Sequence, residues 1–144
     1  MGSLNGTYPL KLDDKSRVTL PAKIRSAFEG ELLFLVCDQN RCLSIATREA
    51  FDKRWERQES APTTSEYARG FKRWLHARTE ETHMDGQGRV TLGAVQRQWA
   101  GLDRDVVVAG AGDRLEIWNP AAFDDYMAEQ DERFANMDTG EMPW

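Results

Sequence analysis

The sequence predicts an α+β protein, mainly β, in which two tandem repeats with short helices pair around a pseudo-two-fold axis to form one barrel. The first observation is self-similarity. Shifting the 144-residue chain by 72 positions gives about 15 identities over roughly 52 aligned positions without a gap. The second is that apolar runs and turn signals follow the same order in both halves. The third is size: a unit of roughly 50 residues is marginal alone, so two units are expected to share one core.

The repeat divides the chain into four segments. We expect a first repeat at 7–58, a helical connector at 59–78, a second repeat at 79–130 and an acidic tail, frayed, at 131–144. The matching positions are of two kinds, apolar and charged. The main pairs are Val18/Val90, Leu20/Leu92, Val36/Val108, Leu43/Leu115, Ile45/Ile117, Phe51/Phe123, Asp13/Asp85, Arg17/Arg89 and Arg25/Arg97.

Each repeat is expected to begin with a strand that enters an Asp-x-x-x-Arg turn and continues into a β-branched run, Val-Thr-Leu. A short helix follows. In the first repeat Pro21 suits the first helical position, and the helix at 22–28 ends at Gly30. The second repeat has Gly93 instead of the proline, and its helix ends near Gly101.

Two apolar strands and a closing helix complete each repeat. The strands are predicted at 32–37 and 42–46, then at 105–109 and 115–118, joined by turn-forming residues. Asn119 and Pro120 predict the start of the second closing helix.

The connector is also predicted to be helical. Thr63 and Glu66 form a capping-box pattern. An aromatic stripe follows at helical spacing, which favours core packing over a platform for base stacking. The stripe consists of Tyr67, Phe71, Trp74 and Leu75.

Charge is unevenly distributed along the chain. The total of −5 excludes a protein that coats nucleic acid through bulk positive charge. Residues 1–25 nevertheless carry a net +3 and residues 61–100 a net +2, whereas 101–144 carry −8. At physiological salt a remote acidic segment barely cancels a basic rim, because the Debye length is about 8 Å. The other interpretation of this pattern is an ordinary solvated surface.

The repeated charged residues are not needed by a core. For Asp13 and Asp85 a structural role is open, in which each accepts N–H groups of its turn and orients its arginine. For Arg17, Arg89, Arg25 and Arg97 an outward role is favoured, because a planar guanidinium suits phosphate or guanine recognition.

Other classes of protein are poorly supported. The chain lacks the phosphate-loop, dinucleotide-binding, zinc-protease and nucleophile-elbow motifs. His76, His83, Cys37 and Cys42 form no ligand pattern, so no metal, cofactor or catalytic site is expected. The longest apolar run is too short to span a bilayer, and the first residues do not resemble a signal peptide. We therefore expect a cytoplasmic protein that is not an enzyme.

At these motifs the chain resembles the MraZ family of bacterial transcriptional regulators, which are built from two swapped-hairpin repeats of the AbrB/SpoVT type. The resemblance covers about residues 6–129. It rests mainly on residues 10–25 and on the second copy, Met84-Asp85-Gly86-Gln87-Gly88-Arg89-Val90-Thr91-Leu92. Residues 100–108 and 114–118 also match.

The resemblance implies a protein that binds double-stranded DNA and is associated with the nucleoid. It also implies a homo-oligomeric ring that binds repeated boxes in the promoter of the division and cell wall gene cluster. Carried over by position, Arg17 and Arg89 become the main DNA contacts and Lys11 and Lys15 become phosphate contacts. Asp13 and Asp85 orient the motif.

Two positions depart from the family pattern. Ser16 stands where glycine is usual, which is expected to make the first turn less tight, because serine tolerates a positive φ less well. Gly93 stands where proline is usual and is expected to loosen the second short helix. Two rivals remain: an assembly or partner-binding barrel whose arginines make subunit salt bridges, and a small enzyme on a related barrel.

Overall fold

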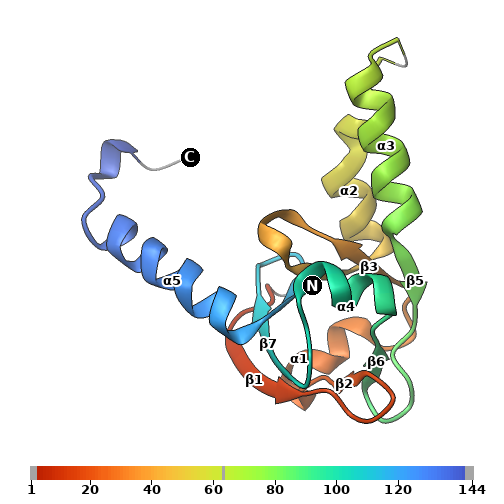
Figure 1. Cartoon of the computed structure of the whole chain (residues 1–144), viewed down its shortest axis with the longest axis vertical. Coiled ribbons are helices and arrows are strands. Elements are labelled where there is room, and N and C mark those ends of the chain that lie inside the picture. The colour runs from red at the N-terminus through yellow and green to blue at the C-terminus, as the bar shows by residue number, and fades with distance from the viewer. Residues whose placement is uncertain (1–2, 63, 142–144) are drawn as a thin grey trace.

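The computed structural model describes residues 3–62 and 64–141 and shows an α+β fold with a mostly antiparallel sheet (Figure 1). Six strands pair in the order β1-β7-β8-β4-β3-β5, and β2 and β6 form a separate two-stranded ribbon. The strands are β1 (Thr7–Lys11), β2 (Arg17–Thr19), β3 (Leu33–Cys37), β4 (Leu43–Thr47), β5 (Glu80–Thr82), β6 (Arg89–Thr91), β7 (Asp105–Gly110) and β8 (Leu115–Trp118). The pairing is an open sheet with edges at β1 and β5, so the expected barrel does not appear as a closed ladder.

Helices connect the strands in the predicted order. The α-helices are α1 (Ala22–Arg25), α2 (Arg48–Glu59), α3 (Glu66–Arg78), α4 (Ala94–Ala100) and α5 (Pro120–Ala135). Short 3-10 turns are η1 (Ser26–Phe28), η2 (Gln39–Arg41) and η3 (Thr139–Glu141). The helix predicted at 22–28 is thus α1 continued by η1, and Gly101 closes α4 in the left-handed conformation, with φ of 61°.

Strands are exchanged between the two halves of the chain. β1 from the first half pairs with β7 from the second, and β5 from the second pairs with β3 from the first. Residues 72 apart oppose each other in two ladders: Val18 faces Val90 in the ribbon, and Ser44 faces Glu116 in the sheet. Equivalent residues can face each other only on a local two-fold axis, so the axis passes through both pairs.

One expected correspondence is wrong by one residue. Leu35 pairs with Ile45, and Val108 pairs with Ile117. Since Ile45 and Ile117 are equivalent, Leu35 rather than Val36 corresponds to Val108. A shift of one residue moves a strand side chain to the other face of the sheet. Val36 accordingly packs on the outer face, while Val108 lies in the main core.

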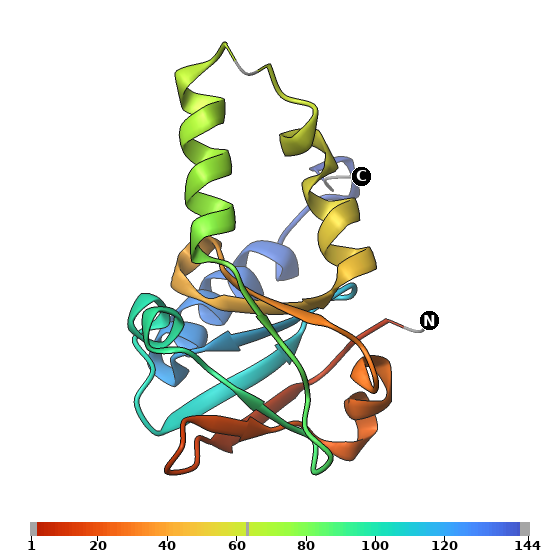
Figure 2. The same ribbon diagram turned by 90° about the vertical axis from the view of Figure 1, so that its right-hand side faces the viewer.

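Three apolar clusters explain this arrangement. The inner face of the sheet packs against the ribbon through fully buried residues such as Val18, Leu20, Val90 and Leu92. On the outer face, α2 and α3 cover Phe34 and its neighbours. Figure 2 shows these two helices rising on the side of the sheet opposite the ribbon. α5 covers the remaining part through Phe123 and Tyr126, which contact Trp118.

The connector and the C-terminal segment differ in detail from the expectation. Thr63 lies outside the described residues, and Ser65 caps α3 by accepting a hydrogen bond from the Ala68 N–H. Phe71, Trp74 and Leu75 pack against the sheet as predicted, but Tyr67 is 89% exposed and takes no part. The acidic segment does not fray at residue 131, because α5 continues to Ala135. Its start agrees with the prediction, since Asn119 caps it by accepting from the Ala122 N–H.

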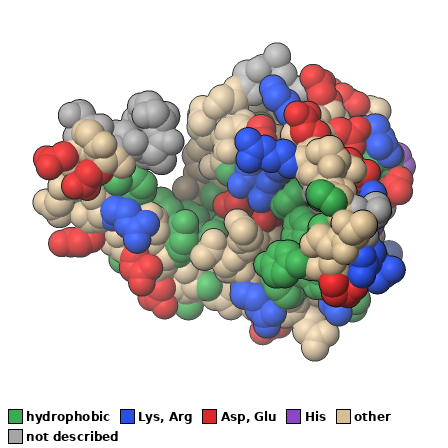
Figure 3. All heavy atoms as spheres, turned by 90° about the horizontal axis from the view of Figure 1, so that it is seen from above, with side chains coloured by type: hydrophobic (Ala, Val, Ile, Leu, Met, Phe, Trp, Pro, Cys, Tyr) green, Lys and Arg blue, Asp and Glu red, His purple; other side chains and the backbone are tan. Residues whose placement is uncertain are grey.

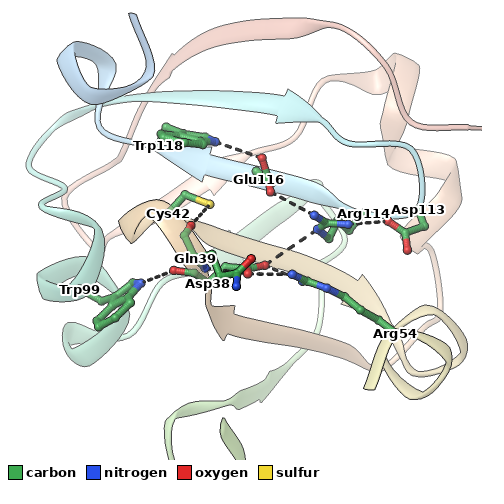
Figure 4. Close-up of polar contacts among 9 residues, drawn as sticks. All are labelled: Asp38, Gln39, Cys42, Arg54, Trp99, Asp113, Arg114, Glu116 and Trp118. Carbon is green, nitrogen blue, oxygen red and sulfur yellow. Dashed lines mark hydrogen bonds and ion pairs between the residues drawn. The ribbon is translucent and has the colours of Figure 1, made fainter. Parts of the chain in front are cut away.

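A buried ion network ties the two halves together at the loops that follow β3 and β7 (Figure 4). Both terminal nitrogens of Arg54 donate to the carboxylate of Asp38, at 2.5 and 2.8 Å, and the Asp38 side chain is only 3% exposed. Nε of Arg114 approaches the same carboxylate at 3.9 Å, while its terminal nitrogens bind Asp113 and Glu116. Burial alone would raise the pKa of Asp38, but the hydrogen bonds and charge of Arg54, with the Gln39 N–H, outweigh burial and hold that pKa below its usual range.

We predict that Arg54→Leu lowers the free energy of unfolding by about 3 kcal/mol, because it leaves the Asp38 carboxylate buried without its main partner. Denaturant titration measures the loss, and Arg57→Leu, an exposed arginine on the same helix, is the control. Because the pKa of Asp38 is lower in the folded than in the unfolded protein, its ionised carboxylate stabilises the folded state at pH values above the unfolded pKa of about 4. This stabilisation is lost as the pH falls from about 4 through the folded-state pKa. The difference between wild type and Arg54→Leu should therefore narrow below pH 4. Equal losses in both variants would contradict a role of the Asp38–Arg54 pair.

Candidate nucleic-acid interface

The two Asp-x-x-x-Arg segments form two loops at the end of the molecule opposite α2 and α3 (Figure 2). The first loop joins β1 to β2, and the second joins β5 to β6. The loops are brought together because β2 and β6 pair with each other. The ribbon strand that follows each motif therefore pairs with the ribbon strand of the other repeat. The sequence repeat predicted the motifs, but it did not predict this pairing.

Each loop is closed by its aspartate. Asp13 Oδ1 accepts the N–H groups of Lys15 and Arg17, both at 2.9 Å, and the Asp13 carbonyl accepts the Ser16 N–H at 3.0 Å. Asp85 makes the equivalent contacts with Gln87, Arg89 and Gly88, at the same distances. The structural role left open for these aspartates is therefore present in both loops.

The same carboxylates hold the arginines. Nε of Arg17 donates to Asp13 Oδ2 at 2.7 Å, and Nε of Arg89 donates to Asp85 Oδ2 at 2.7 Å. The N–H of Arg17 and then its guanidinium lower the pKa of Asp13, and Arg89 lowers the pKa of Asp85 in the same way. Both aspartates therefore stay ionised at a lower pH than a free aspartate does. Within the described part of the chain no acceptor binds the terminal nitrogens of Arg17 or Arg89, so one edge of each guanidinium is fixed and the other is available.

The β2–β6 register places both arginines on one face. Arg17 pairs with Thr91 and Arg89 with Thr19, so these four side chains share the outer face, while Val18 and Val90 point into the core. The arginine side chains are only about one quarter exposed, 24% and 27%, so they lie along the outer face of the ribbon rather than extending fully into solvent. Thr19 and Thr91 are exposed. The sequence did not lead us to predict a role for these threonines. Their recurrence between Val and Leu in both repeats nevertheless indicates a shared position on the outer face.

The predicted lysines occupy different positions. Lys15 is exposed in the first loop, and no ion pair holds it within the described residues. Lys11 at the end of β1 forms an ion pair with Asp105 at 3.1 Å, with both side chains 66% exposed. An exposed pair of this kind is weak, so Lys11 can exchange its partner at little cost. The second loop has His83 and Gln87 at the equivalent positions, and the first loop is therefore the more basic.

Arg25 and Arg97 do not project outward, contrary to the expectation. Arg25 donates through Nε and a terminal nitrogen to the carbonyl of Leu20, and Arg97 donates through Nε to the carbonyl of Leu92. Each arginine thus binds the main chain where a ribbon strand ends. Arg25 also lies directly over Gly88 of the other repeat, because a Cβ added at Gly88 would overlap its guanidinium. The first repeat therefore supports the second loop.

The two departures from the family pattern have clear structural outcomes. Ser16 adopts a positive φ of 59° and makes the same turn as Gly88, so the first turn is as tight as the second. The expected loosening after Gly93 is also not seen, because α4 is a regular helix of seven residues whereas α1 has four.

Two general features complete the description. Among the residues that the structure describes, no group of three or more His, Cys, Asp or Glu side chains is arranged to hold a metal ion. In the same residues, none of the helices has the length and apolar character needed to cross a membrane.

The fold and the site define a protein of two strand-exchanging repeats whose paired loops present the same Asp–Arg unit twice. A family model described as "MraZ protein, putative antitoxin-like" matches residues 4–74 and again 75–141. The chain is 45% identical over 130 residues to the transcriptional regulator MraZ of Mycobacterium ulcerans and to that of Mycobacterium tuberculosis, and 43% identical to that of Saccharopolyspora erythraea. Each alignment covers 90% of both chains. The chain belongs to the MraZ family.

We predict opposite effects for two substitutions at equivalent loop positions. Gly88→Ala should lower the free energy of unfolding by about 1–2 kcal/mol, because φ is +79° and the new Cβ would displace Arg25. Ser16→Gly should raise it by about 0.5 kcal/mol, because it relieves the positive φ. Gly86→Ala is the matched control, since its φ is not positive and no atom lies within 4 Å of the added Cβ. Chemical denaturation measures all three, and a neutral Gly88→Ala would contradict the tight packing of Arg25 on the loop.

Proposed function

We propose that this protein is a transcriptional regulator that binds double-stranded DNA sequence-specifically through the β2–β6 ribbon and its two loops. The observation that carries the proposal is the placement of Arg17 and Arg89 on one exposed face, each with one edge held by an aspartate and the other free. The major groove of B-DNA admits a two-stranded β-ribbon, and a fixed guanidinium fork suits guanine or phosphate. The relatives named transcriptional regulator support the same class of function.

The residues divide into two roles in this proposal. Arg17 and Arg89 are the main contacts, and Asp13 and Asp85 orient them. Lys15 and Lys11 contact phosphates beside the first loop, where the chain is most basic. Thr19 and Thr91 share the face of the arginines and add hydroxyl groups to it.

Affinity in this proposal comes from repetition. One chain offers only a few cationic contacts, and such binding is weak and falls steeply with salt. A homo-oligomeric ring would present many copies of the ribbon to repeated promoter boxes, and the effective concentration would raise the overall affinity. By family resemblance the target is the promoter of the division and cell wall gene cluster, and the protein acts in the cytoplasm at the nucleoid. The protein then works by binding rather than by catalysis.

We also propose the division into repeats at 7–58 and 79–130 with a connector at 59–78. Its support is that each half supplies the same order of strand, ribbon strand, short helix, hairpin and long helix. The segment 131–144 follows as an acidic tail, and its first residues belong to α5, which ends at Ala135.

The rival function is a non-catalytic assembly whose repeated arginines form contacts between subunits. The two proposals differ in a measurable respect. If the rival is right, the oligomer depends on Arg17 and Arg89, whereas in the DNA-binding proposal it does not.

A gel-shift titration with a fragment of the protein's own upstream region, repeated over a range of salt concentrations, tests the proposal. A shuffled fragment of the same length and composition is the comparison. We expect tighter binding to the upstream fragment, with a steep salt dependence on both fragments. Equal affinity for the two fragments would refute sequence-specific regulation.

We predict that Arg17→Ala and Arg89→Ala each lower affinity for the upstream fragment by at least tenfold and leave the oligomer mass unchanged. Removing one base-reading or phosphate-binding side chain costs about 1–3 kcal/mol of binding free energy. Lys15→Ala should weaken binding to both fragments alike and reduce the slope of log K against log salt by about 0.9 for each phosphate that is no longer neutralised. Arg57→Ala, on α2 far from the ribbon, is the control. A smaller oligomer in Arg17→Ala would favour the rival instead.

A further inference from the structure

An aromatic groove lies on the surface where α2, α3 and α4 meet the β3–β4 loop. Four rings follow one another along it, with neighbouring centroids 5.4 to 6.3 Å apart. In order, these rings are Trp55, Phe71, Trp74 and Trp99. The groove has a volume of about 580 Å³, and all four rings line it. All four are partly rather than fully buried, so part of this aromatic floor is open to solvent.

The groove is not a by-product of the repeated fold. The shift of 72 positions that relates the repeats exchanges three groove residues for residues of different chemistry. It matches Trp99 with Ala27, Trp55 with Met127 and Arg41 with Asp113. The other two rings belong to α3, which lies in the connector between the repeats. The chain thus builds this aromatic surface from side chains that the repeat does not supply twice.

Arg41 stands at one end of the floor as a fixed cation. Its guanidinium lies 4.4 Å from the centroid of the Trp99 ring. That ring is held in turn, because its Nε1 donates to the Asp38 carbonyl at 2.9 Å (Figure 4). Asn40 and Arg41 both have a positive φ, 62° and 59°, and strain of this kind in non-glycine residues is concentrated at functional sites. Within the described residues, the guanidinium of Arg41 has no hydrogen-bond acceptor and no ion pair.

A second cation borders the groove. Arg78 follows Trp74 by four residues on α3, so the two side chains share one face of this helix. Burial raises the pKa of the groove-lining Cys37 thiol, and the charges of Arg78 and Arg41 oppose that rise, so both charges act at the groove. Arg78 is exposed, and its guanidinium also lacks an acceptor in the described part of the chain. In Figure 3, hydrophobic side chains lie next to a group of Lys and Arg side chains on the body of the molecule.

The other polar side chains that line the groove carry no free charge. Asp38 is the one carboxylate among the lining residues, and Arg54 already holds it. Gln39 and Asn40 are exposed on the β3–β4 loop and also line the groove. A carboxamide offers donors and an acceptor together, which suits the edge of a heterocyclic base. The groove therefore combines a flat aromatic floor, neutral amides and two available guanidinium groups.

We infer that the aromatic groove binds a free nucleotide, whose base lies on the aromatic floor and whose phosphate binds Arg41 and Arg78. Aromatic rings suit a nucleobase because every base has a flat π face, and a planar guanidinium matches phosphate oxygens. The volume of about 580 Å³ is that of a small-molecule site, whereas a single strand needs a groove that follows several nucleotides. The helices α2 and α3 that line the groove stand on the side of the sheet opposite the ribbon, so this site is separate from the proposed DNA interface (Figure 2).

Tryptophan fluorescence of the full chain measures this binding, because three of the five tryptophans line the groove. The probes are the monophosphates of adenosine, guanosine, cytidine and uridine, the four matching nucleosides, and ribose phosphate. We expect saturable quenching by at least one monophosphate, with one molecule bound per chain in calorimetry. Its nucleoside should bind about tenfold more weakly, because the charge-assisted contacts to phosphate are lost, and ribose phosphate should not quench. The absence of saturable binding by all four monophosphates at millimolar concentration would overturn the inference.

Two single variants connect the phosphate to the arginines. Arg41→Gln and Arg78→Gln change exposed side chains, so circular dichroism should show an unchanged fold. Each should weaken binding of the monophosphate by about fivefold to tenfold and leave binding of the nucleoside unchanged. Arg57→Gln, an exposed arginine on α2 that does not line the groove, is the matched control. Monophosphate affinity that survives both variants would contradict the inference, and so would a nucleoside that loses as much affinity as the monophosphate.

A single-stranded oligonucleotide of the preferred base separates a free nucleotide from a nucleic-acid strand. We expect the monophosphate to bind at least as tightly as one site of the strand. If the strand bound through Arg41 and Arg78 while no free monophosphate did, the groove would be a single-strand surface and the inference would be wrong. None of these measurements contains double-stranded DNA, so failure of the proposed regulatory function leaves their result unaffected.

Discussion

The pairing of β2 with β6 is the contact on which the rest of the structure depends. Two main-chain hydrogen bonds, from the Leu20 N–H to the Gly88 carbonyl and from the Leu92 N–H to the Ser16 carbonyl, extend this ladder across the two-fold axis at 2.8 and 2.9 Å. They force each repeat to complete the loop of the other. The side chains of Val18 and Val90 then lie next to each other in the core. The opposite face of the same two strands carries the arginines. The same pairing of β2 with β6 therefore forms the core and places the arginines on the outer face.

This coupling explains why the charged residues recur. Asp13 and Asp85 each use one carboxylate oxygen for N–H groups of the turn and the other for the arginine, so the turn and the guanidinium are held by the same group. A free arginine on a flexible loop would lose side-chain entropy on binding, whereas an arginine already held along one edge loses less. Arg25 and Arg97 hold the ends of the ribbon strands by donating hydrogen bonds to the carbonyls of Leu20 and Leu92.

The sequence predicted those parts of the fold that depend on local chemistry. The helix start at Asn119 and Pro120, the helix end at Gly101 and the Asp-x-x-x-Arg turns follow from residue types at fixed spacing. It failed where a distant contact decides the outcome. The ungapped match of Val36 with Val108 is wrong because the hairpin pairing shifts β7 by one residue. Arg25 was expected outside, but the unpaired carbonyl that it binds is created only when the ribbon strand ends. Tyr67 shares the helical spacing of Phe71, yet it lies beyond the part of α3 that reaches the sheet.

The same reasoning applies to the uneven charge. A total of −5 is a poor description of a chain whose first 25 residues are basic and whose last 44 hold most of the acidic excess. The basic segment belongs to the ribbon, and much of the acidic excess lies on α5, which projects from the other side of the sheet (Figure 1). Acidic residues close to the ribbon would oppose phosphate, apart from the two aspartates that are neutralised by their own arginines. Separation of charge along the chain thus keeps most of the acidic excess away from the ribbon that is proposed to bind DNA.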